Sequence, residues 1–208
     1  MNLKRLIILV TPFLLLTLAG CESSNTDKRP SKSEVHQNKV DKASKTFVNS
    51  PSDGTYLKYL QAELGANHVG TVRHSPHKYA VTMIKKYTFS SEKQYKKFGK
   101  SMQSILSVAK RTNYAKGGLG FIQHKKDGDT AFTFAYSKKD IKDGELSKSA
   151  LKNDYDPVFE NATSFYIEPF FKQDTNNNIM TDSDVNAGPI VGPDKKSLNT
   201  EIMETFDE

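Results

Sequence analysis

The segment from Ser90 to Thr112 limits the possible architectures of this chain more than any other stretch. Its apolar side chains recur at steps of three and four residues, at Tyr95, Phe98, Met102, Ile105, Leu106 and Ala109. On a helix, this spacing gathers them within an arc of about 100°, the width of a stripe that faces a core. A single stripe of this kind needs a second layer to pack on, and a sheet is the natural partner.

Strand signals surround this helix and predict that sheet. Asp127-Gly128 lies between two alternating runs, which is typical of a tight β-hairpin. The expected strands are Val69–His74, Tyr79–Phe89, Gly118–Lys125, Thr130–Ser137 and Ser164–Phe171. The sequence therefore predicts an α+β domain: a small antiparallel sheet of about four or five strands with one long helix packed on one face.

A shorter helix is expected before the first strand, with Asp53 as its cap and Gly65 at its end. The segments on either side of this domain are polar. Residues 22–50 hold almost no large apolar side chains, so we expect a flexible tether. Residues 173–208 are acidic, and we expect a mostly disordered tail that ends in a short amphipathic segment with Leu198, Ile202 and Phe206.

The first 21 residues carry the features of a secretory signal. Lys4 and Arg5 precede an apolar stretch, and the small residues Ala19 and Gly20 lead to Cys21. The run Leu18-Ala19-Gly20-Cys21 resembles the lipobox of bacterial lipoproteins. The resemblance implies that Cys21 becomes the first residue of the mature chain and carries fatty acids such as palmitate. An ordinary signal peptide with a chance cysteine is the alternative.

Four segments follow from these patterns: a signal peptide over 1–20, a lipidated tether over 21–50, a globular domain over 51–172 and an acidic tail over 173–208. Lipid on Cys21 would anchor the protein to the outer face of the cell membrane without a spanning helix. Cys21 is also the only cysteine, so a lipidated chain has no disulfide, no thiol nucleophile and no thiolate metal ligand.

The charge is divided between the domain and the tail. Residues 51–172 hold 20 basic and 12 acidic residues, whereas residues 173–208 hold 2 and 8. On the long helix, Lys93, Lys96, Lys97, Lys100 and Arg111 lie opposite the apolar stripe. They form either a solvated face or a contact surface for anionic lipid or an anionic cell-wall polymer. A secreted domain is on the wrong side of the membrane for nucleic acid, which we exclude as a partner.

Three histidines, His68, His74 and His77, are the candidate metal ligands, although Pro76 separates the last two. Exposed loop histidines explain the same spacing, and we expect neither a metal site nor a cofactor.

No nucleophile motif is present in the sequence. We therefore expect a non-catalytic binding or scaffolding module at the cell envelope, with an envelope protein among its candidate partners. The alternative is an envelope hydrolase in which His124 meets carboxylates from the 138–163 segment.

Overall fold

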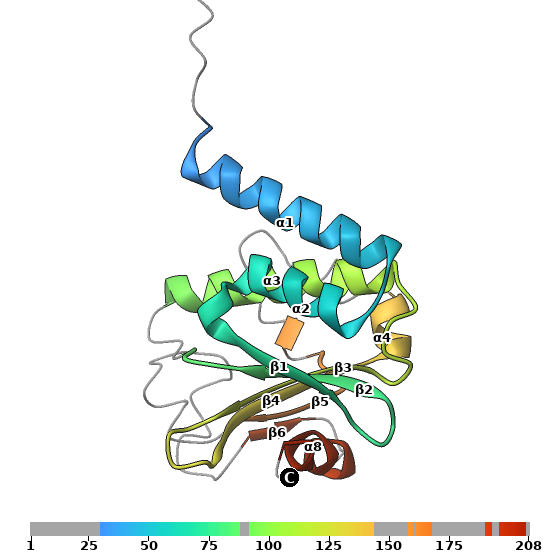
Figure 1. The fold of residues 1–208 in the computed structure, drawn as a ribbon. Helices are drawn as coiled ribbons and strands as arrows, with labels where there is room; N and C mark the ends of the chain where they lie inside the picture. The colour runs from blue at the N-terminus through green and yellow to red at the C-terminus, as the bar shows by residue number, and fades with distance from the viewer. Residues whose placement is uncertain are drawn as a thin grey trace, which may run out of the picture.

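The computed structural model describes residues 30–87, 92–143, 158–159, 161–167, 190–192 and 196–206. Its helices are α1 (Lys32–Asn49), α2 (Asp53–Leu64), a short 3-10 helix (Ala66–His68), α3 (Glu92–Lys110), α4 (Lys138–Asp143) and α8 (Lys196–Glu204). Its strands are β1 (Val69–His74), β2 (Tyr79–Ile84), β3 (Gly118–His124), β4 (Thr130–Ser137), β5 (Ser164–Ile167) and β6 (Ile190–Gly192). These elements form the layered domain drawn in Figure 1.

The predicted α+β fold is confirmed, and one feature of the sheet differs from the expectation. The six strands follow one another in the order β1 to β6, and four of the five neighbouring pairs are antiparallel. β2 and β3 are parallel, with Val81 opposite Gly120. A parallel pair requires a long crossover connection, and the segment that contains α3 supplies it. The sheet is therefore mixed rather than wholly antiparallel.

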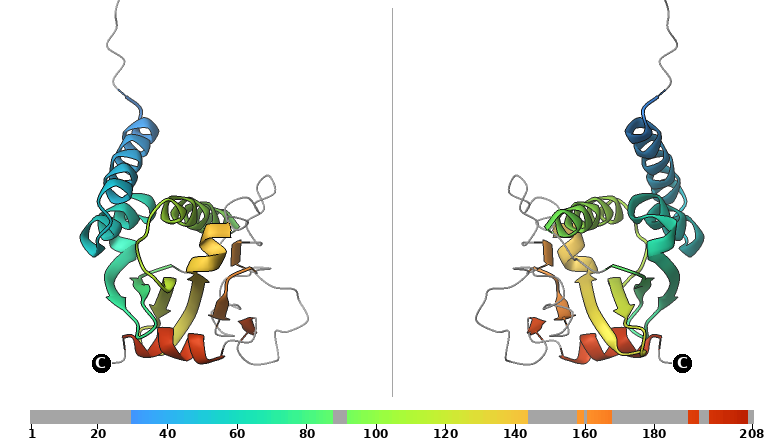
Figure 2. Two further views of the ribbon diagram at one scale, coloured as in Figure 1. Left: turned by 90° about the vertical axis from the view of Figure 1, so that its right-hand side faces the viewer. Right: turned by 90° about the vertical axis from the view of Figure 1, so that its left-hand side faces the viewer.

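Helices cover both faces of this sheet. α1, α2 and α3 lie on one side and α8 lies on the other (Figures 1 and 2). Phe132, Phe134 and Tyr136 of β4 are buried in the core beneath α3. Ala135, which points the other way, is buried in a second apolar cluster with Leu198 and Ile202 of α8. The alternation along β4 thus serves two cores, where the sequence pattern predicted one.

The expected tether is a helix for much of its length. α1 begins with a capping box in which Ser31 and Glu34 exchange hydrogen bonds. Near its end, Phe47 is fully buried, and its ring centroid lies 5.2 Å from that of Tyr56 and 5.3 Å from that of Tyr114. One well-placed aromatic residue therefore attaches a polar segment to the core. The flexible tether that we predicted through residue 50 is corrected for residues 32–49.

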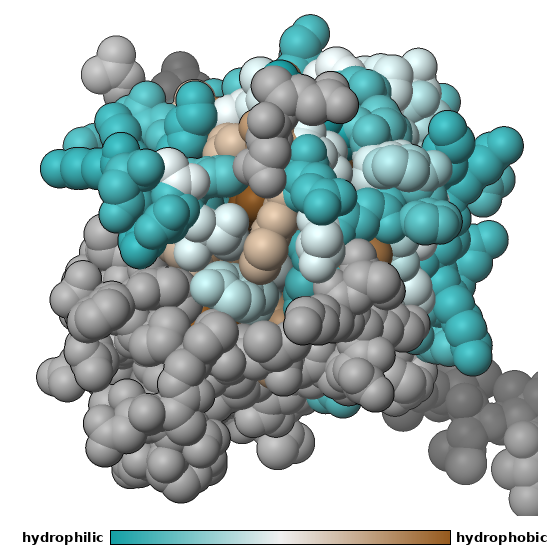
Figure 3. Space-filling model, turned by 90° about the horizontal axis from the view of Figure 1, so that it is seen from below, coloured by the Kyte–Doolittle hydropathy of each residue, from teal (hydrophilic) through white to brown (hydrophobic). Residues whose placement is uncertain are grey.

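The C-terminal segment belongs to the domain as well. We expected the domain to end near residue 172, but β6 extends the sheet beside β5, and α8 packs against the sheet. Ile202 packs closely over Gly120, where a Cβ would lie 2.8 Å from its Cδ1 atom. The amphipathic segment predicted at the C-terminus is thus a helix with a defined place. Figure 3, seen from the α8 side, shows a narrow hydrophobic strip among hydrophilic side chains.

The N-terminal signal lies outside the described residues. The structure therefore does not bear on Cys21, and its lipidation stays a prediction. Within the described ranges, none of the helices combines the length and the apolar character needed to cross a membrane.

Candidate functional site

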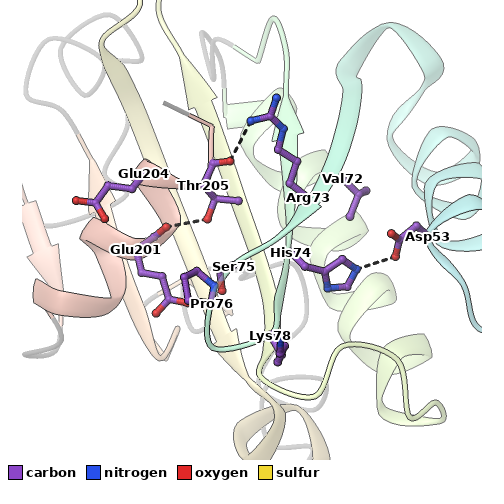
Figure 4. A pocket seen from close by; sticks show the side chains of 10 residues that line it. All are labelled: Asp53, Val72, Arg73, His74, Ser75, Pro76, Lys78, Glu201, Glu204 and Thr205. Carbon is purple, nitrogen blue, oxygen red and sulfur yellow. Dashed lines mark hydrogen bonds and ion pairs between the residues drawn. The ribbon is translucent and has the colours of Figure 1, made fainter. Parts of the chain in front are cut away.

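An open pocket of about 910 Å³ lies at the turn between β1 and β2. Figure 4 shows Glu201 of α8 and Thr205, which follows this helix, on one side, Asp53 at the start of α2 on the other, and His74 of β1 between them. Three segments that are distant in the sequence thus meet at one end of the sheet. The volume of the pocket falls in the range of sites that bind small molecules.

Asp53 organises the α2 side of this pocket. Its Oδ1 atom lies 2.8 Å from Nε2 of His74 and accepts a hydrogen bond of 2.6 Å from the Tyr114 hydroxyl. Burial alone would raise the pKa of Asp53, but the bonds from Tyr114 and His74 outweigh it, so the pKa is lowered. Asp53 is therefore a carboxylate that fixes the His74 ring through its Nε2 atom.

The helix cap explains why Asp53 is available for this role. We expected Asp53 to cap α2, but Ser52 is the cap, and it forms a capping box with Thr55. Asp53 is the first helical residue, and its side chain turns towards β1 instead. Tyr114 is fixed in the same way: burial and the bond to Asp53 raise the pKa of its hydroxyl, so it remains a neutral donor.

Glu201 organises the α8 side. Its carboxylate accepts hydrogen bonds from the His77 backbone N–H at 2.9 Å and from the His77 ring at 2.5 Å. Burial would raise the pKa of Glu201, but hydrogen bonds from Ser75 and His77 lower it. Arg73 adds a further link, because its guanidinium donates to the Thr205 carbonyl at 3.3 Å. These contacts attach the end of α8 to the β1–β2 turn.

The Glu201 contacts predict a measurable pH dependence. Because its pKa in the folded chain lies below the ordinary value of 4.5, the Glu201 carboxylate stabilises the fold above about pH 4.5, and this stabilisation is lost as the pH falls through the lowered pKa. The free energy of unfolding should therefore fall less between pH 6 and pH 3 in Glu201→Gln than in the parent chain. We expect the difference to be at most about 1 kcal/mol, because His77 is exposed. Urea denaturation at pH 6 and pH 3 measures it. If the free energy of unfolding fell by the same amount in the variant as in the parent chain, the stabilising role of the Glu201 carboxylate would be contradicted.

A smaller pocket of about 530 Å³ lies beside the first and shares His74 and Lys78 with it. Its other walls are Pro51 and the loop that follows α3, which contributes Tyr114 and Lys116. The two pockets therefore flank the same turn of the β1–β2 hairpin.

The three candidate metal ligands do not converge. His68 bonds the Lys85 carbonyl through Nδ1 at 3.0 Å, whereas His74 contacts Asp53 and His77 contacts Glu201. Among the residues that the structure describes, no three His, Cys, Asp or Glu side chains gather as metal ligands. The three histidines are close in the sequence, but each makes a separate contact in the fold.

His124, the residue central to the hydrolase alternative, lies at the other end of the sheet near the hairpin turn. Its Nδ1 atom lies 2.7 Å from the Gly128 carbonyl, and its Nε2 atom is buried without a partner. None of its hydrogen bonds within the described ranges reaches a carboxylate. Residues 144–157 and 160, which hold four of the six acidic residues of the 138–163 segment, lie outside the described residues.

The basic residues of the long helix are placed as expected. Phe98, Met102 and Ile105 of α3 are fully buried. On its other side, Lys93, Lys97, Lys100 and Arg111 are exposed and Lys96 is half-buried. This arrangement fits a solvated face and an anionic contact surface equally well. The lysines do not line either pocket at the β1–β2 turn.

Sequence patterns did not reveal the residues that form the pockets. Asp53 looked like a helix cap, Tyr114 lay in a loop, and Glu201 belonged to the expected tail. The only local signal was the cluster of histidines around the β1–β2 turn. This cluster lies at the pockets, but its histidines bond to carboxylates and to a carbonyl instead of converging as metal ligands.

Comparisons with protein-family models, with curated proteins and with solved structures found no match. The geometry of the site must therefore carry the functional conclusion.

Proposed function

We propose that this protein is a lipid-anchored, extracytoplasmic binding module of the cell envelope that does not catalyse a reaction. The observation that carries the proposal is the open pocket between α2 and α8, whose walls come from three distant segments. Asp53 is hydrogen-bonded to His74, and Arg73 to the Thr205 carbonyl, so these groups are positioned before any ligand arrives. Preorganisation of this kind favours binding.

The hydrogen bonds of the histidines support binding over catalysis. Hydrolases that use a Ser or Thr nucleophile pair its hydroxyl with a base such as histidine. In the described part of the chain, the rings of His68, His74, His77 and His124 bond to carbonyls and carboxylates, and none of them bonds to a hydroxyl. Ser75, next to His74, is buried and accepts a hydrogen bond from the Tyr79 N–H.

The arrangement of the domain is compatible with an anchor at Cys21. The chain enters the domain through α1, on the side of the sheet that carries the three N-terminal helices, whereas α8 lies on the opposite side (Figure 2). A lipid attached upstream of α1 would leave the wall of the pocket formed by α8 facing away from the membrane. Partners in the envelope would then reach it.

Two classes of contact follow from this proposal. The exposed lysines of α3 are suited to anionic lipid or to an anionic cell-wall polymer, because each basic residue near such a surface contributes about 1 kcal/mol. The pocket is suited to a more specific partner, either a small ligand or a segment of an envelope protein.

Replacement of Cys21 tests the anchor. We expect Cys21→Ala to abolish partition of the protein into the detergent phase, because the thiol that would accept the lipid is gone. Phase separation of cell extracts followed by immunoblotting measures it. Membrane partition equal to that of the parent chain would contradict the lipoprotein assignment.

Photo-crosslinking in intact cells tests the pocket. A crosslinking amino acid at Glu204, which is exposed and lines the pocket, should give a discrete adduct detectable by mass spectrometry. The same amino acid at exposed Lys39 on α1 is the matched control and should not give that adduct. Identical adducts from both positions, or none from either, would contradict a binding role for this pocket.

A further inference from the structure

We propose that the smaller pocket binds a small soluble molecule that carries a carboxylate or phosphate on an apolar body, with Lys78 and Lys116 holding the anionic group. This proposal rests on the proposed binding function and specifies its ligand. It concerns the 530 Å³ pocket between the β1–β2 turn and the loop after α3. That volume suits a small molecule better than a polymer.

The composition of the pocket determines the charge of the ligand. Two lysines and His74 line it, and no acidic side chain does. Within the described residues, neither Lys78 nor Lys116 takes part in an ion pair. Asp53, which contacts the pocket residues His74 and Tyr114, is hydrogen-bonded to both of them. The unmatched positive charge therefore favours an anion.

The remaining walls determine the rest of the ligand. Pro51, Tyr114 and Ala115 also line the pocket, and most of its lining surface is apolar. Contact of apolar surface with water is unfavourable, and an apolar ring or chain of the ligand would cover this surface. An inorganic anion would contact the lysines but would leave the apolar walls exposed to water.

The backbone at this pocket includes two positions with positive φ, one of them at the β1–β2 turn. The described residues include three non-glycine residues with positive φ, and two of them, Lys78 at 66° and Ala115 at 52°, line this pocket. Glycine adopts this conformation without the steric cost that a side chain carries. Strain of this kind gathers at functional sites. A lysine in place of glycine at the hairpin turn is explained if its ammonium group is needed there.

The two loops are also locked together. The Gly117 N–H donates to the Lys78 carbonyl at 2.9 Å, and a Cβ on Gly117 would lie 2.2 Å from the His77 carbonyl oxygen. Lys138 fixes the other end, because its ammonium group donates to the Thr112 and Tyr114 carbonyls at 2.8 and 3.0 Å. The two lysines of the pocket are thus carried on backbone that is set before binding.

Titration of the full chain in non-ionic detergent with four matched probes tests the proposal. The probes are 1-naphthyl phosphate, 1-naphthoate, 1-naphthol and 1-naphthylmethylamine, and fluorescence anisotropy reports binding. We expect the two anions to bind at least tenfold more tightly than the neutral and cationic probes. Inorganic phosphate should compete only weakly, since it lacks the apolar body.

Four variants separate a binding role from a structural one. Lys78→Gly should raise the melting temperature by roughly 2–4 °C, because it removes the strain, and should weaken binding of the anions at least tenfold. Lys86→Gly is the matched control, because Lys86 is the third non-glycine residue with positive φ, at 58°, and lines neither pocket; it should also raise the melting temperature but alter affinity by less than about twofold. Lys116→Ala should weaken binding, and Lys45→Ala on α1 should not.

The outcomes distinguish this proposal from the binding function on which it rests. Equal affinity for anionic and neutral probes, with both weakened by His74→Ala, would overturn the anionic ligand and leave a binding pocket. Binding of the anions that survives Lys78→Gly and Lys116→Ala would place them elsewhere on the surface and overturn the proposal. No binding of any probe would overturn it too, and the crosslinking experiment at Glu204 would still judge the larger pocket.

Discussion

Truncation of the chain after residue 195 is expected to lower the free energy of unfolding by at least about 4 kcal/mol. Leu198 and Ile202 of α8 are both buried against the sheet. Removing a buried leucine or isoleucine side chain costs about 2–5 kcal/mol, and the truncation removes two of them. Since small domains have only about 5–15 kcal/mol of net stability, much of the truncated chain should be unfolded.

The truncation also leaves polar groups without partners. Asn199 is buried, accepts a hydrogen bond from the Thr133 hydroxyl at 3.1 Å and donates one to the Phe165 carbonyl at 2.9 Å. Without α8, Val81 and Ile122 of the sheet would face water as well. The loss is therefore expected to exceed the contribution of the two apolar side chains alone.

Point variants provide the controls. Ile202→Ala should cost about 2–5 kcal/mol, whereas Glu204→Ala, at an exposed position of the same helix, should change stability by less than about 0.5 kcal/mol. Urea denaturation followed by circular dichroism measures all three variants. A truncated chain that unfolds at the same urea concentration as the full chain would show that α8 is not part of the core.

Phe98→Ala is expected to cost about 3–5 kcal/mol, because this residue joins the long helix to the sheet. Phe98 is fully buried, and its ring centroid lies 4.4 Å from that of Tyr87, 5.9 Å from that of Phe159 and 6.3 Å from that of Phe132. Truncation to alanine would leave a cavity that these rigid rings cannot fill. Phe132→Ala, from the sheet side of the same contact, should have a similar cost.

Phe206→Ala is the matched aromatic control. Its ring is half-buried beneath the Arg73 guanidinium, which lies 5.1 Å from the ring centroid. We expect a loss of about 1 kcal/mol there. Thermal and urea denaturation of the variants give the comparison. If Phe98→Ala and Phe206→Ala destabilised the chain equally, the helix stripe would not face the core as described.

The local elements of this protein could be predicted from its sequence because their signals are short-range. The stripe through Phe98, Met102 and Ile105 set the face that α3 buries, and Asp127-Gly128 set the β3–β4 hairpin. β1 and α2 also lie where their patterns predicted them. In each case the periodicity or the turn residue acts within a few positions of the chain, so neighbouring residues suffice to determine the structure.

The attachment of the two flanking segments depended on contacts that no local pattern displays. Phe47 fixes α1 through rings that come from α2 and from the loop after α3. Ile202 fixes α8 through the space that Gly120 leaves in β3. The amphipathic pattern of the C-terminal segment predicts its helix but not where that helix packs, and the surface that stabilises each segment lies far away in the sequence.

The tertiary structure alone decided the site. The sequence determined the local elements and indicated a cluster of histidines near one turn, but the parallel pairing of β2 and β3 depends on how the α3 crossover packs across the sheet. That packing brings Tyr114 to Asp53, and the docking of α8 brings Glu201 to His77. These partners are 61 and 124 residues apart. Such contacts form only when two cores close on opposite faces of one sheet, so their chemistry is a property of the fold and not of any segment.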